Sequence, residues 1–349
     1  MDTDQLFDVT IVGGGPAGLY SAFYSGLREM KTKIIEYQSF LGGKVHVYPQ
    51  KMIWDVGGLT PILGTKLIEQ LVKQGLTFHP EVVLNEKVQA IARNEEGIFV
   101  LRTSSGQQHY SKTVIIAVGG GILKPKKLAL EGAERFEGSN LHYTVKSIGH
   151  FRDKTVLLSG GGNSAIDWAN ELEPVAKQVY LVYRKDSLTG HEAQVKQLLD
   201  SSAVCFFHTS ITKLIASKGS KRFECVELTN HETGKVSYLT VDEAVINHGY
   251  ERDTSLLENS SLDIEKIDDY FIAGTAHGES SVPGLYAAGD ILTYDGKLHL
   301  IAGAFQDAAN AVNKAKQYTQ PNADQRAMVS SHNEIFKQRN RELVKQMLQ

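Results

Sequence analysis

Cysteine is scarce in this chain, which contains only Cys205 and Cys225, 20 residues apart. The pair forms no C-x-x-C motif, and the ligand spacing of a structural zinc site is also absent. The sequence therefore predicts neither a dithiol centre nor a metal site, and it fits a reducing, cytoplasmic compartment. Cys205 stands in the apolar run 203–207 and is predicted to be a buried strand residue.

Long hydrophobic runs and a strong charge excess are missing too. No apolar stretch approaches the roughly 18 residues of a transmembrane helix, so no membrane span is predicted. The formal net charge of −3 gives no reason to expect nucleic acid or an anionic membrane as a partner. The acidic N-terminus leads directly into a predicted strand and is not typical of a signal peptide. At 349 residues, the chain is long enough for two domains.

The stretch Phe7–Gly18 combines a β-branched apolar run, the pattern G-x-G-x-x-G and the start of a helix. Gly13 allows the tight turn, Gly15 lets the backbone approach a pyrophosphate, and Gly18 lets the helix pack on the strand. The next predicted strand ends in Glu36, 18 residues after Gly18, where a carboxylate can accept hydrogen bonds from ribose hydroxyls. This unit predicts a bound dinucleotide, and its acid suits the adenosine of FAD; the alternative is a glycine-rich turn without a ligand.

The segment after Glu36 has a glycine pair in Leu41–Lys44, which permits a loop to fold close over a ligand. Tyr48 is a candidate to lie against a flat ring, although it can equally be an ordinary packed aromatic. Ile62–Gln74 has the spacing of an amphipathic helix, whose expected inward residues are Leu63, Leu67, Ile68, Leu71 and Val72. Alternating or apolar segments then predict strands at Thr77–Leu84, Val88–Arg93, Ile98–Thr103, Gln107–Ser111 and Thr113–Val118.

A second strand, turn and helix unit begins at Lys154. Its following strand, Gln178–Tyr183, ends in Arg184 and Lys185 instead of an acid. Cations there would bind a 2′-phosphate that a carboxylate would repel, so the unit predicts NADPH over NADH. Arg184 is the expected main phosphate ligand and Lys185 a weaker one; a solvated basic turn is the alternative. His191 is a further weak candidate, and the loop pattern G-x-G-x-x-A supplies Gly160, Gly162, Asn163, Ser164 and Ala165.

A third signal is the predicted strand Leu285–Ala288, which ends in Gly289 and Asp290. Gly289 lets the backbone come near a cofactor, and Asp290 can hydrogen-bond a ribityl hydroxyl or bridge to the pyrophosphate. A helix opening within Lys297–Gln306 would direct its N-terminus at the flavin pyrimidine. The alternative is an ordinary strand–turn–helix.

Together these motifs resemble the flavoproteins with two dinucleotide-binding domains that are built like bacterial thioredoxin reductase. The resemblance covers nearly the whole chain and rests on Gly13–Gly18, Leu41–Lys44, Gly160–Ala165, Tyr183–Lys185 and Gly284–Asp290. It implies an α/β fold of two Rossmann-like, three-layer domains, with an NADPH domain inserted in a discontinuous FAD domain. The implied bounds are 1–118 and 250–349 for FAD and 119–249 for NADPH, with crossing strands at Gly119–Gly121 and Asn247–Gly249.

Thioredoxin reductases carry a C-x-x-C motif shortly before the second glycine loop, where this chain has Tyr143 and Lys146. The chain therefore resembles the ferredoxin/flavodoxin–NADP⁺ reductases of the thioredoxin-reductase type, which lack the dithiol and have an added C-terminal segment, here from Tyr318 onward. The resemblance implies non-covalent FAD, NADPH, hydride transfer from NADPH to FAD, and reversible single-electron transfer to ferredoxin or flavodoxin. It also implies a homodimer, in which the C-terminal tail can reach the partner subunit.

The resemblance assigns FAD contacts to Glu36, Lys44, Tyr48, Val88, Leu123, Asp290 and Ser331. Lys44 departs from the family's usual Gln. Tyr48 would stack on one flavin face, and Val329 stands where the family has an aromatic cap on the other face, with His332 as the alternative. No side chain is expected to act as a nucleophile or general base, because the flavin carries the chemistry.

An acidic carrier would need a local basic patch on this mildly acidic chain. Lys124, Lys126 and Lys127 form one candidate, and the C-terminal Lys337, Arg339, Arg341 and Lys345 form another. Two other functions stay open at this point. One is a flavoenzyme that reduces a small acceptor such as a ferric chelate, quinone or oxygen; the other is a non-catalytic FAD/NADPH redox sensor.

Overall fold

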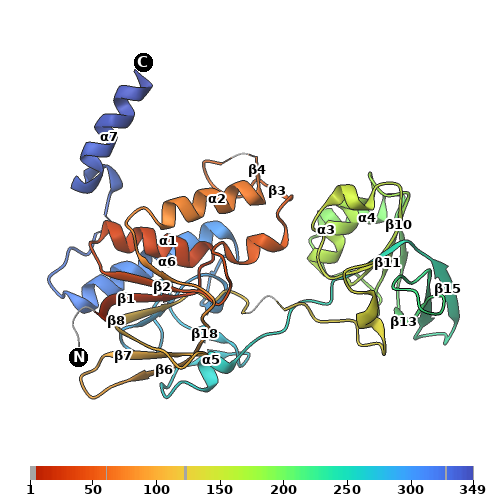
Figure 1. Ribbon diagram of the computed structural model, residues 1–349, viewed down its shortest axis with the longest axis horizontal. Coiled ribbons are helices and arrows are strands. Elements are labelled where there is room, and N and C mark those ends of the chain that lie inside the picture. The colour runs from red at the N-terminus through yellow and green to blue at the C-terminus, as the bar shows by residue number, and fades with distance from the viewer. Residues whose placement is uncertain (1–4, 60, 122–123, 327, 349) are drawn as a thin grey trace. The chain divides into compact units, whose positions relative to one another are not determined.

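The computed structural model describes residues 5–59, 61–121, 124–326 and 328–348, and the chain divides into two compact units (Figure 1). Unit 1 comprises Met1–His46, Lys51–Ile122 and Arg252–Gln349, and unit 2 comprises Val47–Gln50 and Leu123–Glu251. Unit 1 is therefore discontinuous in sequence. Among the described helices, none combines the length and the apolar character that crossing a membrane requires.

Unit 1 is built on a seven-stranded sheet in which β1 pairs parallel with both β2 and β8. The strand order is β5-β2-β1-β8-β7-β6, and β19 adds to β8 from the far end of the sequence. The apolar runs predicted as strands become the buried centre of this sheet. The strands are β1 (Leu6–Val12), β2 (Thr32–Ile35), β5 (Glu81–Val83), β6 (Val88–Arg93), β7 (Phe99–Thr103), β8 (Gln108–Ile116) and β19 (Leu285–Ala287).

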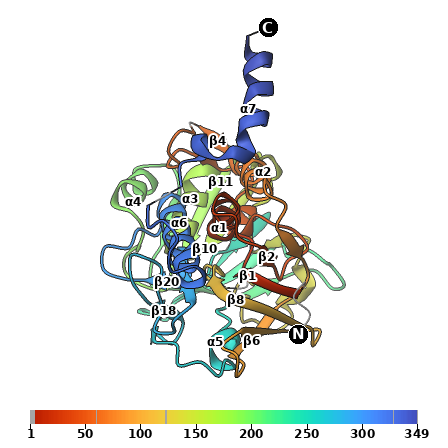
Figure 2. The ribbon, with the colours of Figure 1, turned by 90° about the vertical axis from the view of Figure 1, so that its left-hand side faces the viewer.

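Helices α1, α2 and α6 lie on one face of this sheet, and α5 packs on β6 (Figures 1 and 2). The small residues of α1 allow it to pack closely on α6. The helices of unit 1 are α1 (Pro16–Leu27), α2 (Gly64–Gly75), α5 (Ser255–Glu258), α6 (Ile301–Thr319) and α7 (Glu334–Met347). Its remaining strands are β3 (Met52–Ile53), β4 (Ile62–Leu63), β17 (Lys266–Ile267), β18 (Phe271–Ala273) and β20 (Leu292–Thr293).

Three predictions about unit 1 are wrong in detail. The strand expected at Thr77–Leu84 is limited to β5, because residues 76–79 form a hydrogen-bonded turn in which His79 has a φ of +54°. The two strands expected at Gln107–Ser111 and Thr113–Val118 form the single strand β8, because the buried Ser111 and Thr113 hydroxyls donate to backbone carbonyls and the strand continues. Helix α2 begins at Gly64 instead of Ile62, and Leu63 is 40% exposed in β4. The expected inward residues Leu67, Ile68 and Leu71 are buried.

Unit 2 contains a parallel five-stranded sheet in the order β12-β11-β10-β16-β9. Cys205, predicted to be buried, is half-buried because β12 is an edge strand. Residues 124–126 and 249–251, which adjoin the expected crossing strands, pair with each other, since Lys126 donates its N–H to the Gly249 carbonyl at 2.9 Å and Glu251 donates its N–H to the Lys124 carbonyl at 2.8 Å. The elements are β9 (Leu141–His142), β10 (Thr155–Ser159), α3 (Asn163–Leu172), β11 (Gln178–Val182), α4 (Glu192–Leu199), β12 (Val204–Phe206), β16 (Glu243–Ile246) and a separate sheet of β13 (Thr209–Ile215), β14 (Cys225–Asn230) and β15 (Val236–Thr240).

Candidate functional site

The first glycine loop joins β1 to α1 and packs closely against neighbouring backbone at Gly13 and Gly18. A Cβ on Gly13, whose φ is +108°, would stand 2.5 Å from the Ala117 carbonyl oxygen. A Cβ on Gly18 would stand 1.9 Å from the Gly13 oxygen, so no other residue fits at either position. At Gly15 the nearest described atom would be the Gly43 Cα at 3.7 Å. The loop therefore has the open approach at Gly15 that a pyrophosphate needs.

Glu36 is buried directly after β2, and its carboxylate is held over this loop. One oxygen accepts the Gly14 N–H at 2.6 Å and the other accepts the Gln38 N–H at 2.7 Å. Each carboxylate oxygen has a second lone pair, so both oxygens can still accept a ribose hydroxyl. The position and remaining hydrogen-bonding capacity of Glu36 fit the adenosine ribose of FAD.

The segment Leu41–Lys44 crosses the first glycine loop at close range. Gly42 donates its N–H to the Gly14 carbonyl at 2.9 Å. A Cβ on Gly43, whose φ is +59°, would come within 2.7 Å of the Gly15 Cα. The glycine pair is thus needed for backbone contact between the two loops, and it leaves Lys44 exposed.

The turn at Gly289 and Asp290 lies against the first turn of α1. A Cβ on Gly289, whose φ is +78°, would stand 3.0 Å from the Cβ of Ala17. The Asp290 carboxylate is 40% exposed, and one oxygen lies 3.8 Å from the His299 Nδ1. The structure therefore brings the third sequence motif next to the first, with an acid available to a ligand.

A buried group behind this turn was not predicted from the sequence. Asp307 of α6 is fully buried and accepts the Gly289 N–H at 3.0 Å and the Tyr294 hydroxyl at 2.9 Å. The oxygen that accepts the Gly289 N–H also pairs with the ammonium of Lys297, whose side chain is 3% exposed. Burial and the bond to Asp307 raise the pKa of Tyr294 to about 12. Asp307 thereby ties the Gly289 turn to the segment that enters α6.

Of the residues expected to contact FAD, two are packed against protein side chains and a third lies outside the residues that the structure describes. Tyr48 belongs to unit 2, where it is half-buried against a cluster that contains Val145 and Phe151. Val88 is 4% exposed and its side chain packs within the core of unit 1. Leu123 lies outside the described residues. The roles assigned to these residues stay predictions.

The C-terminal segment is anchored at the end of α1 remote from the glycine loop. Arg28 donates to the carbonyl oxygens of Asp324 and Arg326 at 2.7 and 2.9 Å. The Met328 N–H donates to the Tyr24 hydroxyl at 2.9 Å. Since α1 has 12 residues, this anchor lies about 18 Å along the helix from Gly15. Val329 and Ser331 are exposed there, and the side chain of His332 lies outside the description.

The second glycine loop, between β10 and α3, has the same steric arrangement as the first. A Cβ on Gly160, whose φ is +149°, would stand 2.6 Å from the Asn247 carbonyl oxygen. At Gly162, which caps α3, a Cβ would meet no described atom within 4 Å. Ala165 is buried, whereas Asn163 and Ser164 are exposed at the N-terminus of α3. The open face of the loop fits a second pyrophosphate.

The basic segment after β11 folds over this second loop. Thr189 donates its N–H to the Gly161 carbonyl at 2.8 Å, and His191 donates its N–H to the Asn163 side chain at 2.9 Å. Arg184 and Lys185 are exposed beside these contacts. This arrangement offers exposed cations next to the nucleotide loop, as a 2′-phosphate requires.

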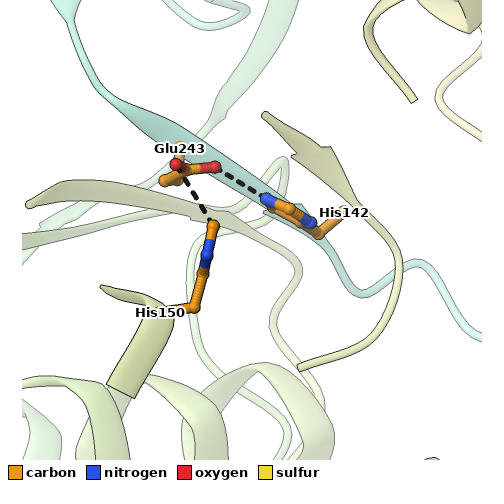
Figure 3. Close-up of side chains that lie close together, drawn as sticks. All are labelled: His142, His150 and Glu243. Carbon is orange, nitrogen blue, oxygen red and sulfur yellow. Dashed lines mark hydrogen bonds and ion pairs between the residues drawn. The ribbon is translucent and has the colours of Figure 1, made fainter. Parts of the chain in front are cut away.

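Unit 2 also contains a charged cluster that the sequence did not predict (Figure 3). The Glu243 side chain is fully buried, and its oxygens lie 2.7 Å from the His142 Nε2 and 3.3 Å from the His150 Nε2. Lys154 and Arg222 approach the same carboxylate at 2.7 and 3.2 Å. Two histidines and a carboxylate are metal-binding residue types, but the two neighbouring cations already neutralise this carboxylate and disfavour a further cation. The cluster fits a structural role.

Glu243→Gln should therefore destabilise the protein. Hydrogen bonds and nearby cations lower the pKa of Glu243 to about 2, although burial opposes them, so its stabilisation is present above the ordinary value of 4.5. It is lost as the pH falls from 4.5 towards 2. We expect a loss of about 3 kcal/mol in the free energy of unfolding at pH 7, measured by urea titration. The exposed Glu224→Gln should change it by less than about 0.5 kcal/mol; an equal effect of both substitutions would contradict this role.

Both cysteines are free and half-buried, and burial raises the pKa of the Cys205 thiol. At positions 143 and 146, where the dithiol would stand, Tyr143 hydrogen-bonds the Leu128 N–H at 3.2 Å and Lys146 is exposed. Neither unit thus offers a thiol pair that could accept electrons.

Comparisons with known proteins agree with this geometry. The profile of the pyridine nucleotide-disulphide oxidoreductase family matches residues 7–315. The chain is 75% identical over 347 residues to ferredoxin–NADP reductase 1 of Bacillus licheniformis, covering 99% of each chain, and 72% identical over 348 residues to ferredoxin–NADP reductase 1 of Bacillus mycoides, covering 100% of each. The thioredoxin reductase of T. acidophilum shares the fold, with a TM-score of 0.76 and 24% identity over 90% of this chain and 99% of that one. The chain belongs to the ferredoxin–NADP reductases of the pyridine nucleotide-disulphide oxidoreductase family.

Proposed function

We propose that this flavoenzyme passes electrons from NADPH to ferredoxin, with FAD held by unit 1 and NADPH by unit 2. The observation that carries the proposal is the opposite charge beside two similar glycine loops. The first loop has the buried carboxylate of Glu36, and the second has the exposed cations Arg184 and Lys185. An acid suits a bare ribose and cations suit a 2′-phosphate, so the two loops favour different nucleotides.

The residues of this chain bind and orient the nucleotides and do no covalent chemistry. Gly13, Gly15 and Gly18 would admit the FAD pyrophosphate to the N-terminus of α1, while Glu36 would hold the ribose. Asp290 would accept a hydrogen bond from the FAD chain beside Ala17. When bound, FAD supplies the exchange between the two-electron chemistry of NADPH and single-electron transfer. With no thiol pair in the chain, a one-electron protein carrier is the favoured acceptor.

Two local patches could meet an acidic carrier, ferredoxin or flavodoxin. In the first, Lys124 pairs with Glu251 and Lys127 with Glu137, both at 2.8 Å, so the acids offset two of its three lysines. In α7, four basic residues stand against two acidic ones, an excess of two positive charges. The charge balance favours α7 as the docking element.

A homodimer would complete the FAD site. Within one chain, the tail containing Val329 and Ser331 is anchored about 18 Å along α1 from Gly15, so it does not cover that chain's own loop. A second copy could supply the cap through its own tail. This explains how the predicted positions Val329 and Ser331 can contact a flavin.

The test is NADPH-driven reduction of cytochrome c, with and without added ferredoxin or flavodoxin. We expect large stimulation by the small carrier and a much higher rate with NADPH than with NADH. Rapid turnover that ignores the carrier would instead favour a reductase of small acceptors. Failure of NADPH to bleach the flavin would contradict both reductase functions and favour a non-catalytic redox sensor.

A further inference from the structure

His248 lies at the mouth of the second glycine loop, although no sequence motif marked it. It follows β16, which pairs in parallel with β10, the strand that leads into the loop. Asn247 donates its N–H to the Ser159 carbonyl at 2.8 Å, and the His248 Nε2 lies 2.9 Å from the Ser159 hydroxyl oxygen. The Asn247 carbonyl is also the atom that requires glycine at Gly160. These contacts fix the imidazole at the carboxyl ends of two adjacent parallel strands, where such sheets bind ligands.

The surroundings of His248 disfavour protonation of its ring in the free protein. Burial is the larger cause that lowers its pKa, and the positive charge of Arg184 is the second. Among the described residues, Arg184 is the charged side chain that acts on this imidazole. The other polar partner is the Ser159 hydroxyl, which does not titrate near neutral pH. Arg184 and a protonated His248 would repel each other unless an anion lay between or beside them.

NADPH brings such an anion. Its 2′-phosphate would neutralise Arg184, and its pyrophosphate would lie at the loop that begins at Gly160. Both changes favour a positive charge on the neighbouring imidazole. We propose that His248 takes up a proton from solvent when the dinucleotide binds, so that the imidazolium becomes a binding residue of the nucleotide site. This inference rests on the proposed placement of NADPH in unit 2.

The sign of the pH dependence follows from linkage. A ligand that prefers protonated His248 binds more tightly as the pH falls between the bound and the free pKa of this residue. Above the bound value, the His248 contribution to affinity disappears. If binding raises the pKa by about one unit, the gain at low pH is about tenfold in affinity.

The experiment is calorimetric titration of the FAD-loaded protein with NADP⁺ between pH 5.5 and 8.5, in two buffers of different ionisation enthalpy to count protons. The wild type is compared with His248→Gln, and with His248→Asn as a second variant. His231→Gln is the matched control, because the His231 Nε2 also lies 2.8 Å from a serine hydroxyl, that of Ser210, in the same unit. The 2′-phosphate titrates near pH 6 in every form and therefore cancels in the comparison.

We expect extra proton uptake on binding at mildly acidic pH in the wild type and the His231 variant, and its loss in both His248 variants. Towards the acidic end of this range, the His248 variants should bind NADP⁺ more weakly than the wild type by up to about tenfold, and at pH 8.5 within about twofold. Identical pH profiles for wild type and both variants would overturn the role of His248. Absence of NADP⁺ binding by every form, including the wild type, would instead overturn the assignment of unit 2 to NADPH.

Discussion

Gly18→Ala should yield a protein that no longer retains FAD. The added Cβ would stand 1.9 Å from the Gly13 carbonyl oxygen and 3.0 Å from its carbon, so backbone meets backbone and no side chain can move aside. Either α1 or the glycine loop must shift, which displaces the N–H groups that would bind the pyrophosphate. Overpacking of this kind costs about 3 kcal/mol, equivalent to FAD binding more than about 100-fold weaker. The flavin absorbance per protein after gel filtration measures the loss.

Gly57→Ala is the control for this substitution. Gly57 belongs to the same unit, and a Cβ there would meet no described atom within 4 Å. We expect Gly57→Ala to keep its full flavin content. Equal flavin content in the Gly18 variant and the wild type would refute the assignment of FAD to the first loop.

Arg184→Ala should reduce kcat/KM for NADPH by about 100-fold while leaving that for NADH nearly unchanged. A charge-assisted contact with a phosphate contributes about 1.5 to 3 kcal/mol. NADH has no 2′-phosphate, so its binding does not depend on this contact. Steady-state kinetics with both nucleotides measure the selectivity directly. Lys185→Ala should show a smaller change in the same direction.

Arg152→Ala is the matched control for the arginine. Arg152 is another exposed arginine of unit 2, but it precedes β10, whereas the glycine loop follows that strand. Its removal should not alter the ratio of NADPH to NADH activity. An equal decrease in kcat/KM for both nucleotides in the Arg184 variant would mean that Arg184 stabilises the loop and does not bind the 2′-phosphate.

The glycine loops and their strands were predictable because their information is local. Gly13 and Gly18 stand five residues apart, and the clash that excludes other residues at Gly18 is with Gly13 itself. The exposed ends of Arg184 and Lys185 follow likewise from their place after a buried strand. The stacking role of Tyr48 is different, because it depends on the bound cofactor and on tertiary contacts that a local sequence pattern does not encode.

The Glu243 cluster was not predictable in the same way. Its partners extend from His142 to Arg222, and none of them forms a spacing pattern with Glu243. The Asp307 group leaves no sequence signal, because an aspartate in an amphipathic helix is normally solvated; only the fold shows that Tyr294 and Lys297 surround it. The anchor of the C-terminal tail joins Arg28 to Asp324, 296 residues apart. Such long-range polar contacts are determined by tertiary packing alone.

The pairing of β19 with β8 has a consequence for biosynthesis. The central sheet of unit 1 cannot close until Leu285–Ala287 has left the ribosome, by which time the whole of residues 124–251 is already available to fold. The inserted unit can thus form during translation, whereas the sheet beside the first glycine loop waits for nearly the entire chain. Nascent chains would expose the apolar edge of β8 during that interval. Truncation before residue 285 should yield an insoluble first unit next to a folded second one.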